Sequence, residues 1–108
     1  MIGVDIGGTN LLVGSIEDGK VVERMHEPIV AKGNFELVAS QTCDAIRKLA
    51  GDNIDSVGIS VAGSVDAKQG VVLRAQNLDW NDAPLASFVS TTLGCKTIIE
   101  NDVTSAAW

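Results

Sequence analysis

The sequence predicts an α/β fold in which a mixed sheet of about five strands is flanked by helices. A glycine turn near the start, at Gly7-Gly8, leads from one apolar strand into another strand and not into a helix. Further along, two segments repeat apolar residues at helical spacing. Each of these segments is followed by a short apolar strand, and the strand at 56–61 is of the kind that is buried in parallel sheets.

The first three strands follow one another directly in the chain. They are expected at Ile2–Ile6, at 11–17 and at 20–25. Asp18-Gly19 is a two-residue hairpin signal, because glycine accepts the positive φ that the turn demands. A dinucleotide-binding βαβ unit is excluded, because a strand follows the glycine turn and the GxGxxG spacing is absent. The GxxxxGK[ST] spacing of a P-loop is absent too.

The first helix is expected to begin at Phe35, after a loop over 28–33. Asn34 is its N-cap and Gly51 its stop signal. The apolar residues on one face of this helix are Val38, Ala45, Ile46 and Leu49.

Beyond this helix the pattern continues as strand, helix and strand. Residues 56–61 form an apolar strand that ends in a small-residue turn at 62–64. A short strand over 70–73 precedes a second helix, which Pro84 opens and Gly94 closes. The last strand covers 96–100. A further helix starts at Thr104 and is not completed, so the chain is expected to be a piece of a larger protein.

The composition bounds the class of protein. With 108 residues, 45% of them hydrophobic and 20% charged, the chain is one globular domain or part of one. The net charge of −6 argues against a nucleic-acid surface. The start shows no signal peptide, and no apolar run approaches the roughly 20 residues of a membrane span, so a cytoplasmic protein is expected.

The cysteine and histidine content leaves little for a metal site or a histidine triad. Cys43 and Cys95 match no metal-binding spacing and are expected to be buried free thiols. His26, the single histidine, is expected in a loop.

Two strand ends carry the residues that suggest chemistry. Backbone N–H groups of a glycine turn can surround phosphate, and Asp102, after the last strand, can orient a hydroxyl nucleophile. Each has a structural alternative. Gly7-Gly8 can simply make a tight hairpin, and Asp102 can cap the helix that follows it.

Four segments of the chain resemble the ROK family of sugar kinases and repressors, within the sugar kinase/actin/Hsp70 superfamily. They are DIGGTN at 5–10, GISVAG at 58–63, NLDW at 77–80 and END at 100–102. Any one motif is weak, but the four occur in the family's order over essentially the whole chain. Two positions depart from the family pattern, with Ala62 at a common proline and Thr104 at a common asparagine.

The resemblance implies a ribonuclease H-like fold of the actin/hexokinase type. Residues 1–108 would be the N-terminal lobe of an ATP-dependent kinase that phosphorylates a hexose or N-acetylhexosamine. The family's E-x-G-H sugar clamp, its adenosine-binding segment and its Cys/His zinc motif do not occur in this chain. Zinc would therefore belong only to a C-terminal lobe. A homodimer is expected from the resemblance alone.

The resemblance also implies roles for particular residues. Asp102 would be the general base and would also contact the sugar. Asp5 would lie near the metal-phosphate group of Mg-ATP. The phosphate-binding residues would be Gly7, Gly8, Thr9 and Asn10. The sugar-binding residues, besides Asp102, would be Gly63, Gln76, Asn77 and Asn101.

Several of these residues have ordinary alternatives. Gln76 and Asn77 can equally be plain loop residues. Trp80 is either a platform for a sugar ring or, as we expect, a lid on the core. Glu100 is expected to face solvent or to brace its loop.

Two other functions are weighed against the kinase. A sugar-sensing ROK regulator without kinase activity would carry a DNA-binding segment before the first strand, whereas Met1 adjoins that strand here. A non-catalytic ATPase-like domain of the actin/Hsp70 kind would lack the pairing of Gly63 with Asn101-Asp102.

Overall fold

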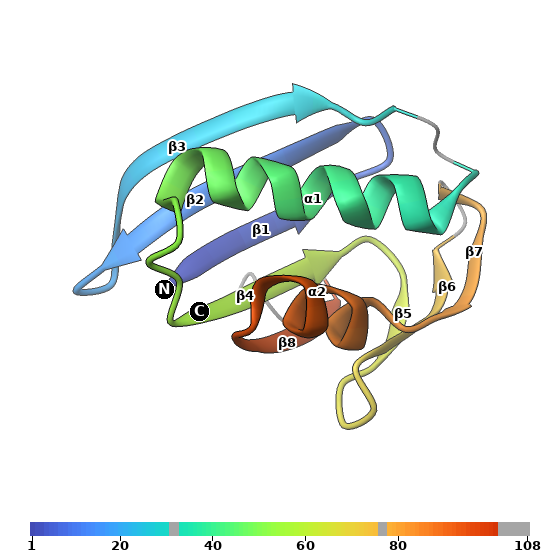
Figure 1. Cartoon of the computed structure of the whole chain (residues 1–108). Coiled ribbons are helices and arrows are strands. Elements are labelled where there is room, and N and C mark those ends of the chain that lie inside the picture. The colour runs from blue at the N-terminus through green and yellow to red at the C-terminus, as the bar shows by residue number, and fades with distance from the viewer. Residues whose placement is uncertain (31–32, 76–77, 102–108) are drawn as a thin grey trace.

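The computed structural model describes residues 1–30, 33–75 and 78–101. Its main sheet is mixed and has five strands in the order β3-β2-β1-β4-β8 (Figure 1). β2 runs antiparallel to β1 and β3, whereas β1, β4 and β8 are mutually parallel. The strands of this sheet are β1 (Ile2–Ile6), β2 (Asn10–Glu17), β3 (Lys20–Pro28), β4 (Ser56–Val61) and β8 (Lys96–Asn101). The predicted sheet is confirmed.

Two helices, α1 (Phe35–Ala50) and α2 (Leu85–Leu93), lie on one face of this sheet (Figure 1). The predicted N-cap is confirmed, because the Asn34 side chain accepts a hydrogen bond from the Leu37 N–H at 3.1 Å. Gly51 and Gly94 follow the two helices with positive φ angles of 65° and 68°. Such angles favour glycine, so both helix ends are encoded locally.

The core lies between the sheet and the helices. Alternate residues of each strand face it, so β1 contributes Ile2, Val4 and Ile6 while Gly3 and Asp5 lie on the other face. Trp80 is 2% exposed, and its ring meets that of Phe35 edge-on at 5.2 Å. The expectation that Trp80 covers the core is therefore confirmed.

A second, small antiparallel sheet extends beyond β4. It comprises β5 (Ser64–Asp66), β6 (Val71–Ala75) and β7 (Trp80–Ala83), with β6 in the middle. The strand predicted at 70–73 corresponds to β6. The other two were not predicted, because strands of three and four residues are too short to show a period.

The third strand is longer than predicted. β3 continues to Pro28, and His26 pairs with Leu12 in the ladder, so the expectation of a loop around His26 is wrong. β3 forms one edge of the sheet, and proline at the last position of an edge strand is well tolerated. Pro28 therefore ends β3 itself, whereas the strand was expected to end at residue 25.

The two cysteines are free, Cys43 buried and Cys95 half-buried. Burial raises the pKa of the Cys43 thiol from 9.0 to about 11. The Cys43 thiol loses its proton at a lower pH in the unfolded chain than in the folded protein. Between pH 9.0 and about 11, therefore, the folded state keeps a proton that the unfolded state has lost. We expect the stability that the neutral thiol contributes to be lost as pH rises from about 9 to about 11.

The measurement that checks this expectation is the unfolding midpoint of the full-length protein and of Cys43→Ala across that pH range. The midpoint of the wild type should fall more steeply with pH than that of the variant. Parallel curves would contradict the assignment of this pH dependence to Cys43.

Candidate active site

The carboxyl ends of the three parallel strands lie in one row at one edge of the sheet. Ile6 of β1 pairs with Val61 of β4, and Val61 pairs with Asn101 of β8. The last residues of these three strands therefore lie side by side. The backbone N–H of Ala62 also donates to the Ile6 carbonyl at 3.4 Å. Ligands of open α/β sheets bind at this kind of edge.

The glycine turn leaves the sheet at this edge. It is short, because the Gly7 N–H donates to the Asn10 carbonyl at 3.0 Å, where β2 begins. The Asn10 amide donates to the Thr9 hydroxyl at 3.1 Å, and both side chains are exposed. On the other side, the Thr9 carbonyl accepts the Ile29 N–H at 2.9 Å. The turn thus presents a hydroxyl and an amide to solvent on a hydrogen-bonded frame.

The backbone of this turn does not itself require glycine. Among the described residues the glycines with positive φ are Gly19, Gly51, Gly70 and Gly94, and neither glycine of the turn is among them. A Cβ added to Gly7 would meet only the Asn10 carbonyl oxygen, at an ordinary 3.5 Å. Neither a positive φ nor a steric clash therefore accounts for glycine at position 7, although the turn itself is tight.

Asp5 lies on the face of the sheet opposite the two helices. It is exposed, and its Oδ1 accepts a hydrogen bond from the Ser60 hydroxyl at 3.1 Å. Asp5 pairs with Ser60, and Ser60 pairs with Glu100, so three polar residues form one row across β1, β4 and β8. An open hollow of about 250 Å³ borders Asp5 and Ser60. Asp5 is therefore a partnered carboxylate within reach of solvent.

The sequence reasoning missed Ser60 and underrated Glu100. Ser60 is 7% exposed. A small hydroxyl between Ile59 and Val61 of a buried strand was the signal that could have identified it. The Oε2 atom of Glu100 is buried and has no hydrogen-bond partner among the described residues. The expectation that Glu100 faces solvent therefore does not hold for this oxygen, and burying it without a partner costs free energy.

Gly63 has a structural role of its own. A Cβ at this position would overlap the carbonyl oxygen of Arg74 and lie 3.0 Å from the Cα of Ala75. The turn after β4 thus packs backbone against backbone on β6. This contact accounts for the glycine whether or not a sugar also approaches it.

The remaining predicted residues divide between described and undescribed positions. Asn101 is the last residue of β8 and is half-buried at the edge where β4 also ends. Asp102, Gln76 and Asn77 lie outside the described residues, so their roles stay predictions.

Within the described ranges, no three His, Cys, Asp or Glu side chains gather as they would around a metal ion. None of the helices in those ranges is long and apolar enough to cross a membrane.

Comparison with known proteins shows the family and the fold. The ROK family model matches residues 1–108. A glucokinase of Streptomyces coelicolor is 34% identical over 99% of this chain, and the match covers 34% of the relative. The crystal structure of a ROK family glucokinase from Streptomyces griseus, in complex with glucose and AMPPNP, superposes with a TM-score of 0.89. It is 35% identical over 99% of this chain and 34% of its own.

A regulator shares the same fold. A ROK family transcriptional regulator, a homolog of the E. coli MLC protein, superposes with a TM-score of 0.87 over 98% of this chain and 28% of its own. Its identity of 18% shows the fold alone.

The chain spans about a third of the length of the glucokinases that it matches.

Proposed function

The chain belongs to the ROK family, and we propose that it supplies one lobe of an ATP-dependent sugar kinase acting on a hexose or N-acetylhexosamine. The observation that carries the proposal is the register of Ile6, Val61 and Asn101. This register brings the glycine turn, the turn at Gly63 and the end of β8 at Asn101 to one edge. Identity of 34–35% to glucokinases over nearly the whole chain supports the same activity.

The glycine turn is the proposed phosphate site. The Gly7 N–H closes the turn onto the Asn10 carbonyl, so the Gly8 N–H would face the phosphates, with the Thr9 hydroxyl and Asn10 amide as further partners. The Asp5 carboxylate, exposed and hydrogen-bonded to Ser60, fits a magnesium ion held mainly by the nucleotide. Such an ion needs only one or two protein carboxylates. When bound, it would neutralise charge that develops on the phosphates.

The sugar would lie against Gly63 and Asn101, with Gln76 and Asn77 as further contacts. Asp102 accepts the proton of one sugar hydroxyl as that oxygen attacks the γ-phosphorus. The new O–P bond forms while the bond from the β–γ bridging oxygen to the γ-phosphorus breaks, and ADP leaves with the electron pair. A second lobe beyond this chain would close over both substrates and exclude water, which favours transfer to the sugar over hydrolysis.

The rival function is a sugar-sensing regulator. The regulator structure matches this fold almost as well as the glucokinase structure does, so the fold does not separate the two. The observation that favours the kinase is identity over nearly the whole chain, 35% to the glucokinase against 18% to the regulator. A putative xylose repressor of Caldicellulosiruptor is 39% identical, but over only 47% of this chain.

The test is sugar-dependent ADP formation by the full-length protein. The sugars to compare are glucose, mannose, fructose, N-acetylglucosamine and N-acetylmannosamine. We expect turnover on at least one of them, and that sugar then defines the substrate class. Binding of a sugar with no ADP formation from any of the five would support the regulator.

A further inference from the structure

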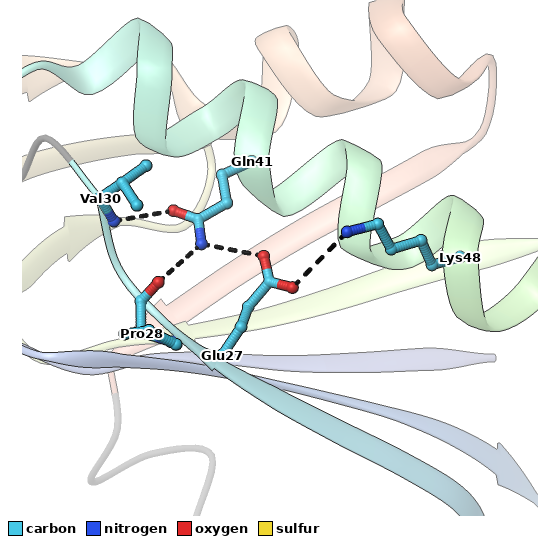
Figure 2. Close-up of polar contacts among 5 residues, drawn as sticks. All are labelled: Glu27, Pro28, Val30, Gln41 and Lys48. Atoms are coloured by element: carbon cyan, nitrogen blue, oxygen red, sulfur yellow. Dashed lines mark hydrogen bonds and ion pairs between the residues drawn. The ribbon is translucent and has the colours of Figure 1, made fainter.

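A single glutamine side chain holds the chain segment that leaves β3. Gln41 lies in the middle of α1 and makes three hydrogen bonds to this segment (Figure 2). Its Oε1 accepts the Val30 N–H at 3.1 Å. Its Nε2 donates to Glu27 Oε1 at 2.9 Å and to the Pro28 carbonyl at 2.8 Å. One side chain thus binds three of the four residues 27–30.

An amide suits this position better than other side chains. The chain leaves the sheet after Pro28, so the Pro28 carbonyl and the Val30 N–H need partners outside the ladder. Only an amide side chain offers two donor hydrogens and an acceptor oxygen together. The neighbouring ion pair is weaker, because Lys48 lies 3.9 Å from Glu27 and its side chain is 66% exposed.

The held segment touches the proposed phosphate site directly. Ile29 lies between two residues that Gln41 binds, and its side chain is 8% exposed. Its N–H donates to the Thr9 carbonyl at 2.9 Å. The adjoining pair of the ladder is Asn10 with Pro28, and Gln41 binds the Pro28 carbonyl. The Thr9 carbonyl is therefore bonded to backbone that Gln41 fixes, and Asn10 lies opposite Pro28 in the same ladder.

We propose that Gln41 is a positioning residue for the phosphate-binding turn. It does not touch the nucleotide, and acts by fixing residues 28–30, which bind the Thr9 carbonyl and lie alongside Asn10. The inference rests on the proposed function only in taking Gly7–Asn10 as the phosphate site. A competing explanation is that Gln41 merely fastens α1 to the edge of the sheet.

The test compares ATP binding by the full-length wild type and Gln41→Met, measured by calorimetry with magnesium present. Methionine keeps the length of the side chain and removes all three hydrogen bonds. We expect ATP affinity to fall roughly fivefold, as the loss of about one net hydrogen bond would produce. Sugar affinity should stay unchanged. Lys48→Met is the matched control, since it removes only the exposed ion pair on Glu27 and should leave ATP affinity unchanged.

Charged substitutions at positions 41 and 27, read by ATP affinity and by the unfolding midpoint, distinguish a role in positioning the turn from a role in attaching α1 to the sheet. Gln41→Glu puts a carboxylate against Glu27 and the Pro28 carbonyl, so ATP affinity should fall further than in Gln41→Met. Adding Glu27→Gln restores a donor between positions 27 and 41 and should recover part of the loss. A lower unfolding midpoint in Gln41→Met with ATP affinity unchanged would overturn the inference, because Gln41 would then be structural only.

The outcomes also separate this inference from the proposed kinase. Weaker ATP binding by Gln41→Met in a protein that phosphorylates none of the sugars would refute the kinase and keep the inference. Equal ATP affinity of the wild type and Gln41→Met, with sugar phosphorylation intact, would refute the inference and keep the kinase. A wild type that binds no ATP would refute both.

Discussion

Asp102→Asn in the full-length protein is expected to lower kcat for sugar phosphorylation by about a hundredfold to ten-thousandfold, the range typical of a general base. The amide cannot accept the hydroxyl proton, although it keeps the size of the side chain and can still hydrogen-bond a sugar. The dissociation constant of the sugar should therefore change little. Steady-state kinetics and sugar binding by calorimetry measure the two effects separately.

This substitution also distinguishes the base from the helix cap. Asparagine caps helices about as well as aspartate, so a residue that serves only as an N-cap would lose almost nothing. Asp55→Asn, at an exposed position just before β4, is the matched control and should keep the wild-type kcat. A wild-type rate in Asp102→Asn would refute the assignment of the base.

Gly63→Ala is expected to destabilise the protein by about 1–3 kcal/mol, the usual cost of forcing extra volume into a packed site. The new methyl group would overlap the Arg74 carbonyl oxygen, which belongs to the β6 backbone and cannot rotate away as a side chain would. The unfolding midpoint of the full-length protein should fall by several degrees. Thermal unfolding without ligands measures this effect apart from any sugar contact.

The control is Gly33→Ala, because nothing lies within 4 Å of a Cβ at Gly33 and its φ is not among the positive values. Its midpoint should equal the wild-type value or lie slightly above it, since alanine restricts the unfolded chain. An unchanged midpoint in Gly63→Ala together with a raised KM for sugar would show that the glycine serves the ligand and not the packing.

The elements that the sequence predicted best are those with local signals. Asp18-Gly19 adopts the positive φ angles of 51° and 77° that a primed hairpin turn needs. The end of β3 and the strands β5 and β7 were missed for a different reason. Their pairing depends on partners elsewhere, and a short polar strand carries little periodicity of its own. Local propensity therefore identified where the main elements lie but not the full extent of the sheets.

The candidate site divides in the same way. Gly7-Gly8 and Asn101 were identifiable because they follow apolar strands in recognisable segments. Ser60 offered only the weak signal of a hydroxyl in a buried strand and Gln41 offered none, because each acts through a contact with a distant part of the chain. Ser60 reaches Asp5 across 55 residues and Gln41 reaches Glu27 across 14. Neither lies in a glycine turn or at a strand end, so only the folded structure shows what they hold.

The most direct test of the proposed kinase is the identity of the phosphorylated product. The full-length protein is incubated with Mg-ATP and the sugar that best stimulates ADP formation, and the products are followed by phosphorus NMR. We predict one sugar phosphate for each ADP, with little inorganic phosphate. ADP that accumulates together with inorganic phosphate and no sugar phosphate would contradict the account, because the site would then transfer phosphate to water and not to a sugar.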